Sequence, residues 1–183
     1  HTITVLCLIL FISRSSINHS KQSQPNSKPL QAAAVYRIIF STLQMRIAMY
    51  CLIQRVSRAS VDVNQKTIAK IQQGLLALIG FHADDNADSC HACIEKVSQF
   101  RLFADEHDKM NRSLIDIGGG LLLVPQFTLV ADTSRGRRPS FTSAAPPEVG
   151  KQLFTQLCDE ARNKISHVAQ GEFGANMQVS LIN

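Results

Sequence analysis

The chain has 183 residues and 45% hydrophobic content, which is enough for one domain of ordinary size with its own core. Its formal net charge is +5, but residues 1–44 contain four basic side chains and no acid, and residues 45–183 hold 15 basic and 14 acidic side chains. This near balance excludes overall basicity as an argument for nucleic-acid binding. Only a local cluster counts, and the strongest one is Arg135, Arg137 and Arg138.

The first 44 residues differ from the rest of the chain. Residues 4–12 are apolar, but they are too few to span a bilayer and no basic segment precedes them, so they make a poor signal peptide. The polar stretch that follows is rich in Ser, Asn, Gln and Pro and is not expected to fold. We expect residues 1–44 to be a disordered or non-native extension, with Met45 as the natural start and residues 45–183 as a single domain.

The first half of that domain has a strand pattern. Residues 47–53 alternate between apolar and polar side chains, and residues 56–63 continue the alternation with a bulge-like slip. A turn at residues 64–65 leads to a second strand over residues 67–71. Residues 75–81 are continuously apolar, which predicts a central strand buried on both faces.

A helix is predicted over residues 87–101, because apolar side chains recur there near helical spacing. Asp84, Asp85 and Asn86 offer N-cap side chains just before it. The acids Asp84, Asp85 and Asp88 are interpreted as helix-start charges that the helix dipole favours, rather than as paired catalytic carboxylates.

The five cysteines are odd in number and lack disulfide-framework spacing, so they predict reduced thiols. Cys90 and Cys93 have the spacing of half a zinc site, but no second pair of ligands follows, so they are interpreted as core residues. The three glycines at 118–120 precede a strand and lack the Lys-Ser/Thr of a phosphate-binding loop. They predict a tight turn or a close backbone approach.

The central stretch combines a buried strand with a polar break. Residues 121–124 form a short apolar run, and Pro125 then interrupts it, which suits a sheet edge or a bulge. The backbone N–H groups just after the proline are candidates for hydrogen bonds outside the sheet. Gln126 and Thr128 add an amide and a hydroxyl there, and the apolar pattern resumes at residues 129–131. We therefore expect an active-site edge at this place, although strand ends often carry such residues without a chemical role.

The last third predicts one helix and one strand. An amphipathic helix begins near Pro147 and continues to Ile165, and a final strand covers residues 177–182. The approximate element order is β-β-β-α-β-β-β-α-β, which predicts a mixed sheet with packed helices.

Three segments carry a family resemblance: MRIAMYCLIQRVSRASV, GGGLLLVPQFTLVADTSRGRRPSF and GANMQVSLIN. In this order they resemble the D-aminoacyl-tRNA deacylases over residues 45–183. The resemblance implies an α/β fold, a mixed sheet or barrel-like core with two packed helices in a single domain. It also implies hydrolysis of the ester that joins a D-amino acid, or mischarged glycine, to tRNA. Such enzymes are cytoplasmic homodimers that bind tRNA and no membrane, with no cofactor or obligatory metal.

The resemblance also implies the site. Gln126 and Phe127 would supply backbone N–H donors near the scissile carbonyl, and Thr128 would be the nucleophile or a positioning side chain. Alternatively, the terminal ribose 2′-OH activates a water. The arginine cluster would contact acceptor-stem phosphates, although a merely solvated basic loop remains an alternative. The implied substrate-binding residues are Arg55, Arg137, Arg138, Pro139, Phe141 and Met177, of which Arg55 would steady the partner's selectivity loop.

Two departures from the family pattern stand out. Pro125 replaces a usual serine, and the family's N-x-G-P-V-T motif, which rejects L-amino acids, should begin at Asn183 and is absent. We therefore expect a truncated chain that is weakly active, poorly selective or unstable. The alternative function is a non-catalytic RNA-binding dimer. A generic small-molecule esterase is a third possibility, disfavoured because no nucleophile elbow or triad is present.

Overall fold

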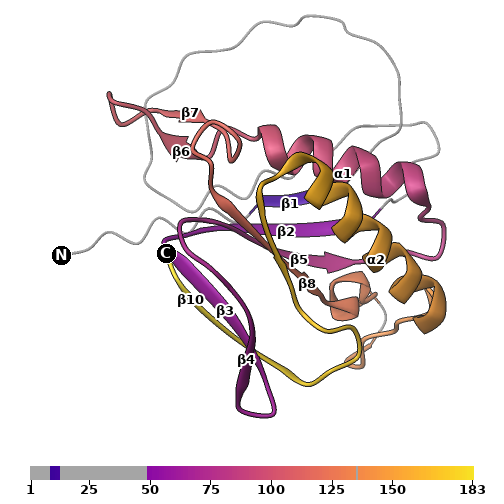
Figure 1. The fold of residues 1–183 in the computed structure, drawn as a ribbon. Coiled ribbons are helices and arrows are strands. Elements are labelled where there is room, and N and C mark those ends of the chain that lie inside the picture. Colours follow the sequence, from indigo (N-terminus) through magenta and orange to yellow (C-terminus); the bar gives the residue numbers. More distant parts are fainter. Residues whose placement is uncertain (1–8, 13–48, 135) are drawn as a thin grey trace, which may run out of the picture.

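The computed structural model describes residues 9–12, 49–134 and 136–183 (Figure 1). Two sheets, a short hairpin, two α-helices and one 3₁₀ helix make up this part of the chain. In chain order the elements are β1 (Ile9–Ile12), β2 (Tyr50–Val56), β3 (Arg58–Val63), β4 (Lys66–Ile71), β5 (Gly74–Gly80), α1 (Ala87–Gln99), β6 (Phe103–Ala104), β7 (Met110–Arg112), β8 (Gly120–Pro125), η1 (Phe127–Val130), α2 (Pro147–Lys164), β9 (His167–Gln170) and β10 (Met177–Ile182).

The larger sheet has the strand order β1-β2-β5-β8-β9. β2 pairs antiparallel with β5, while β8 pairs parallel with both β5 and β9. All of β8 is buried, and so is all of β5 except the half-buried Leu78. Strands covered on both faces need continuous apolar sequence, which explains the two uninterrupted runs that predicted them.

The larger sheet is covered on both faces (Figure 1). Alternate residues of β5 and β8, such as Leu75 and Leu121, belong to a core cluster that includes α1 and α2. Their sequence neighbours Leu76 and Leu122 belong to a second cluster with β3 and β4, which form the smaller sheet β10-β3-β4. Because successive side chains of a strand point to opposite faces, the two helices lie on one side and the smaller sheet on the other. The predicted mixed α/β fold with two packed helices is confirmed.

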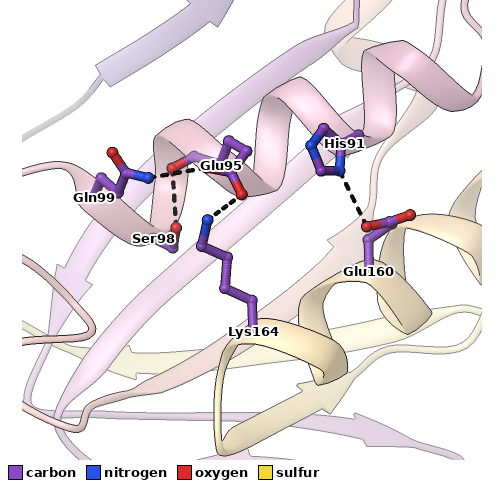
Figure 2. A network of polar contacts seen from close by, with 6 residues as sticks. All are labelled: His91, Glu95, Ser98, Gln99, Glu160 and Lys164. Atoms are coloured by element: carbon purple, nitrogen blue, oxygen red, sulfur yellow. Dashed lines mark hydrogen bonds and ion pairs between the residues drawn. The ribbon is translucent and has the colours of Figure 1, made fainter.

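The two helices pack through apolar side chains and are joined at their solvent edge by polar contacts (Figure 2). Lys164 Nζ contacts the Glu95 carboxylate, and His91 Nδ1 lies 3.3 Å from Glu160 Oε2. Pairs this exposed add little to stability, because water screens their charges, so burial of the apolar stripe dominates. Among the described residues, no helix is long and apolar enough to cross a membrane.

Most element positions follow the sequence pattern. The predicted turn is a two-residue hairpin loop in which Asn64 and Gln65 both have positive φ, as a type I′ turn requires. The first helix ends at Gln99 rather than at residue 101, because Phe100 takes an extended conformation and its N–H caps the Lys96 carbonyl.

One expectation needs correction, and two elements were not predicted. The alternation over residues 47–63 is two strands rather than one pattern with a slip, because the chain leaves the larger sheet after Val56 and enters the smaller one at Arg58. The 3₁₀ helix η1 was not predicted; it covers Phe127–Val130 and so includes most of the apolar residues 129–131. Strand β9 was not predicted, because it has only four residues and its partner β8 is far away in sequence.

Only a short piece of the N-terminal extension is described. Residues 9–12 form β1, an antiparallel edge strand in which Ile9 pairs with Ile53. The rest of the extension, including Met45, lies outside the described residues. Its expected disorder and the expected natural start therefore stay predictions.

Four of the five cysteines are described, and these four are free thiols as predicted. Cys51, Cys90, Cys93 and Cys158 are buried free thiols, while Cys7 lies outside the described residues. Burial raises the pKa of Cys90 and of Cys158 to about 12, and a hydrogen bond with Cys51 together with burial raises the pKa of Cys93. The part of the chain that the structure describes holds no group of three or more His, Cys, Asp or Glu side chains suited to a metal ion.

The β5–β8 pairing depends on a close backbone contact. A Cβ at Gly74 would lie 1.9 Å from the Gly120 carbonyl oxygen, so Gly74→Ala must force the two strands apart. We expect it to lower the free energy of unfolding by at least about 3 kcal/mol, measured by urea denaturation. Gly150→Ala on α2 is the control, because its Cβ would meet only a phenylalanine ring at 3.2 Å, and it should change stability by no more than about 1 kcal/mol. Equal stability of the two variants would contradict the contact.

Candidate active site

The predicted active-site edge is the turn that follows β8. Gln126 N–H donates to the Ile79 carbonyl oxygen of β5 at 2.6 Å, which is the last bond of the β5–β8 ladder. The chain then folds into η1, in which Leu129 N–H donates back to the Gln126 carbonyl at 3.2 Å. Gly80 lies directly beneath, where a Cβ would be 3.0 Å from the Gln126 oxygen. The absence of a side chain at Gly80 therefore lets the turn close over the end of β5.

Pro125 is the last residue of β8 rather than part of an edge strand or bulge. N–H groups along a strand point alternately to its two neighbours, and the next one, from Gln126, points to β5. The position of the missing proline N–H therefore faces β9, which ends at Gln170, just before Gly171 donates to Leu123. The proline thus terminates the ladder where β9 has already ended, which explains why it is tolerated in a central strand.

Two backbone donors of the turn are unpaired. The N–H groups of Phe127 and Thr128 begin η1 and have no acceptor among the described residues, as is general for the first turn of a helix. Gln126 differs from the expectation, since its N–H already bonds to Ile79 and is not available to a substrate. The structure therefore shifts the pair of candidate donors by one residue, from 126–127 to 127–128.

The side chains of the turn hold one another. Nε2 of Gln126 donates a hydrogen bond to Oγ1 of Thr128, so the amide fixes the hydroxyl beside the two unpaired N–H groups. Thr128 is exposed and Gln126 is half-buried. The hydroxyl keeps its own proton available for donation, because it accepts rather than donates in this bond.

An exposed aromatic pair stands beside the donors. The Phe127 side chain is 60% exposed, unusually high for phenylalanine, and its ring packs edge-on against Phe141 with centroids 5.2 Å apart. Met177 packs close to Gly171, near Pro125. A Cβ at Gly171 would lie 2.6 Å from the Met177 sulfur and 3.5 Å from the Pro125 ring. Apolar surface therefore flanks the end of β8 next to the polar turn.

The basic loop is anchored at its base. Asp132 and Ser140 exchange two backbone hydrogen bonds of 2.8 and 2.9 Å, which close the loop between them. Arg137, Arg138 and Pro139 are exposed, and neither arginine forms an ion pair with a described residue. Arg135 lies outside the described residues. The loop thus presents at least two free guanidinium groups next to the turn.

Arg55 is not brought to this site. It lies near the end of β2, paired with Leu75 at the start of β5, whereas the turn follows the other ends of β5 and β8. Its guanidinium donates to the Leu102 carbonyl at 2.8 Å. Within one chain, Arg55 and Thr128 are thus separated by about the length of β8, roughly 17 Å.

A buried carboxylate organises the segment behind the site. Asp85 accepts two backbone hydrogen bonds of 2.7 Å, from Met49 N–H and from His82 N–H. Asn86 caps α1 through a capping box with Ser89, and the two backbone hydrogen bonds give Asp85 a structural role that its interpretation as a helix-start charge did not include. Sequence reasoning missed this role because one of the partners of Asp85, Met49, is 36 positions away.

Asp85 is connected to the basic loop through the backbone. The segment that it holds pairs with the chain that follows Phe141: Ala83 N–H donates to Ser143 and Ala145 N–H donates to Phe81, both at 2.9 Å. These bonds fix the end of the loop that carries the arginines and the aromatic side chain. Burial raises the pKa of the Asp85 carboxyl, although its hydrogen bonds oppose the shift.

Residues 52–183 match the family model described as D-Tyr-tRNA(Tyr) deacylase. The chain belongs to this family. A D-aminoacyl-tRNA deacylase of Ectopseudomonas mendocina is 54% identical over 135 residues, which are 74% of this chain and 93% of that protein. One from Thermosipho africanus is 48% identical over 135 residues, with 74% and 91% covered. The family consists of deacylases, so the chain is a hydrolase, as the resemblance implied.

Solved structures agree with the fold. One described as c-Myc DNA Unwinding Element Binding Protein has a TM-score of 0.69 at 32% identity and covers 73% of this chain and 91% of its own. Another, described as a probable eukaryotic D-amino acid tRNA deacylase, has a TM-score of 0.65 at 16% identity, with 73% and 93% covered. At that identity the second match supports the fold alone.

The raised pKa of Asp85 predicts a pH-dependent difference between wild type and Asp85→Asn. At pH 7 the asparagine should cost about 1–3 kcal/mol, because its NH₂ group cannot accept one of the two N–H bonds. A folded-state pKa above the unfolded value of 3.8 makes wild type gain stability on acidification, whereas the variant lacks this titration. The stability gap, measured by urea denaturation from pH 7 to pH 4, should therefore widen as pH falls. A constant or narrowing gap would refute this account.

Proposed function

We propose that the chain hydrolyses the ester bond between a D-amino acid and the terminal ribose of tRNA, with the turn at residues 126–128 as the active site. Family membership and the named relatives support the reaction class. The observation that carries the assignment to this turn is the pair of unpaired N–H groups, Phe127 and Thr128, beside a fixed hydroxyl. Glycine attached to tRNA fits the same proposal, because it has no side chain to be excluded.

The proposed chemistry relies on backbone donors. The ester carbonyl oxygen would accept hydrogen bonds from Phe127 and Thr128 N–H, which strengthen as negative charge develops on it in the tetrahedral intermediate. One such donor contributes about 3–4 kcal/mol in a well-studied protease. An aminoacyl ester is already activated, so two donors and a positioned nucleophile suffice without a strong base.

Two nucleophiles are compatible with this geometry. Thr128 Oγ1 could attack the ester carbonyl, so that the bond to the ribose oxygen breaks, the tRNA leaves with the hydroxyl proton, and water then hydrolyses the acyl-enzyme. Alternatively, a water deprotonated with help from the ribose 2′-OH could attack directly and release the same tRNA. The Gln126 amide donates to Oγ1 and so draws electron density from it, which lowers its nucleophilicity. This contact favours the second route, in which the hydroxyl orients the substrate or the water.

The surroundings fit an aminoacylated 3′ end. Phe127, Phe141 and Met177 would contact the amino acid or the terminal adenosine through apolar surface. Arg137 and Arg138, with Pro139 beside them, would meet phosphates of the acceptor stem. We also propose the cytoplasm as the compartment, because aminoacyl-tRNA is consumed there in translation.

We further propose that the chain acts as a homodimer. Arg55 would serve substrate selection, yet it lies about 17 Å from the turn in its own chain. A second copy resolves this separation if Arg55 of one chain supports the site of the other.

The first test is hydrolysis of D-tyrosyl-tRNA by the wild-type chain and by Thr128→Ala. Wild type should release free tRNA, and a wild type that binds tRNA but leaves the ester intact would refute the proposed function. If Oγ1 only orients the reaction, Thr128→Ala should lower kcat about 10- to 100-fold without abolishing turnover. Thr155→Ala, which removes the same atoms from the exposed face of α2, is the control and should keep the wild-type rate. Complete loss of activity in Thr128→Ala alone would instead support the nucleophile.

The role of the loop can be tested separately. The double variant Arg137→Ala/Arg138→Ala should raise KM for D-tyrosyl-tRNA and lower the dependence of log KM on log salt by about two, while kcat stays near wild type. Lys109→Ala/Lys151→Ala removes the same charge from two exposed positions outside the loop and is the control. Equal effects of the two double variants would mean that the loop is merely solvated.

A further inference from the structure

Two adjoining cavities lie at the start of β5 and β8, opposite the candidate active site. The first, about 530 Å³, is lined by residues 70–73, 117–120 and 167–169. The second, about 490 Å³, lies between the end of β2 and the β6–β7 hairpin. Gln73 and Ile117 line both cavities, so the two adjoin at these residues, and together they are called the groove.

The groove is built on the glycine turn that precedes β8. The N–H groups of Gly119 and Gly120 donate to Leu114 and Gln73 at 3.0 Å, so the turn is rigid. Gly118 has φ +59, and a Cβ there would meet no atom within 4 Å. The turn therefore leaves open space above its backbone. Because glycine has no side chain, a ligand in this space can approach the backbone closely.

Positive charge lines both parts of the groove. Lys70 lies at the first cavity and Arg112 and Arg55 at the second, and none of them forms an ion pair with a described residue. Asp116 is the one acid in the lining. Its Oδ2 already accepts from both the N–H and the hydroxyl of one serine, at 2.8 and 2.7 Å, and these bonds lower its pKa.

We propose that this groove binds the phosphodiester backbone of RNA, as a second contact for the tRNA whose aminoacyl end is hydrolysed; the inference rests on the proposed function. Leaving aside Arg55, which is proposed to serve the other chain's site, Lys70 and Arg112 place one cation in each of the two adjoining cavities, and this spacing matches successive phosphates better than a single anion. The amides of Gln72 and Gln73 and the apolar Ile117 supply hydrogen bonds and contact surface for ribose and base edges.

Binding of deacylated tRNA, measured by fluorescence anisotropy from 50 to 300 mM salt, tests this inference without requiring catalysis. The variant is Lys70→Ala/Arg112→Ala, which leaves Arg55 intact because of its proposed role in selection. Its matched control is Lys66→Ala/Lys109→Ala, which removes two exposed cations that line neither cavity, one of them from the same strand as Lys70. We expect the groove variant to weaken tRNA binding about 10-fold or more at low salt and to reduce the salt slope by about two. The control should stay within about twofold of wild type.

Three outcomes would overturn the proposal. The first is equal tRNA affinity of the groove variant and its control. The second is binding of AMP or inorganic phosphate that depends on Lys70 and Arg112, while tRNA binding does not depend on them. This result would make the groove a site for small anions. The third is a change of dimerisation in the groove variant with unchanged RNA affinity per dimer, which would make it a protein interface. Weaker tRNA binding by the groove variant supports the groove even if wild type fails to hydrolyse the ester, so failure of the two proposals is distinguishable.

Discussion

The parallel pairing of β5 with β8 is the constraint on which the site depends. Gly74 meets Gly120 at one end, where the backbones are too close for a side chain, and Gln126 N–H meets the Ile79 carbonyl at the other. These two contacts fix the register between the strands. A slip of one residue would exchange the two buried faces of β8 and would also move the first unpaired N–H of the turn. Core packing and the placement of the donors are thus set by the same ladder.

Much of the fold was accessible from sequence because the signals are local. Period-two alternation, two continuous apolar runs and the stripe of α2 predicted most strands and both helices. The two features that were missed or misread depend on distant partners. The sequence around Asp85 shows its place before a helix but not its hydrogen bond from Met49 N–H, and β9 is too short to recognise without β8 beside it.

The candidate site was predictable only in part, and mainly through family resemblance. Backbone N–H groups leave no trace in composition, so the residues indicate where a polar turn lies but not which of its donors are free. The identity of the free donors depends on one hydrogen bond to β5, which moved the pair from 126–127 to 127–128. Arg55 is the reverse case. The segment that carries it is recognisable in the sequence, but its distance from the turn follows only from the strand pairing.

The buried thiols also allow separation of the helices from the larger sheet to be measured. Burial raises the pKa of Cys90 and of Cys158 to about 12, so both are protonated thiols at pH 7. They lie between the helices and the larger sheet, where an alkylating reagent reaches them only after these layers separate. The rate at which these two sulfur atoms are labelled therefore measures how often the helical layer lifts from the sheet, and a bound substrate that slows labelling must stabilise that layer.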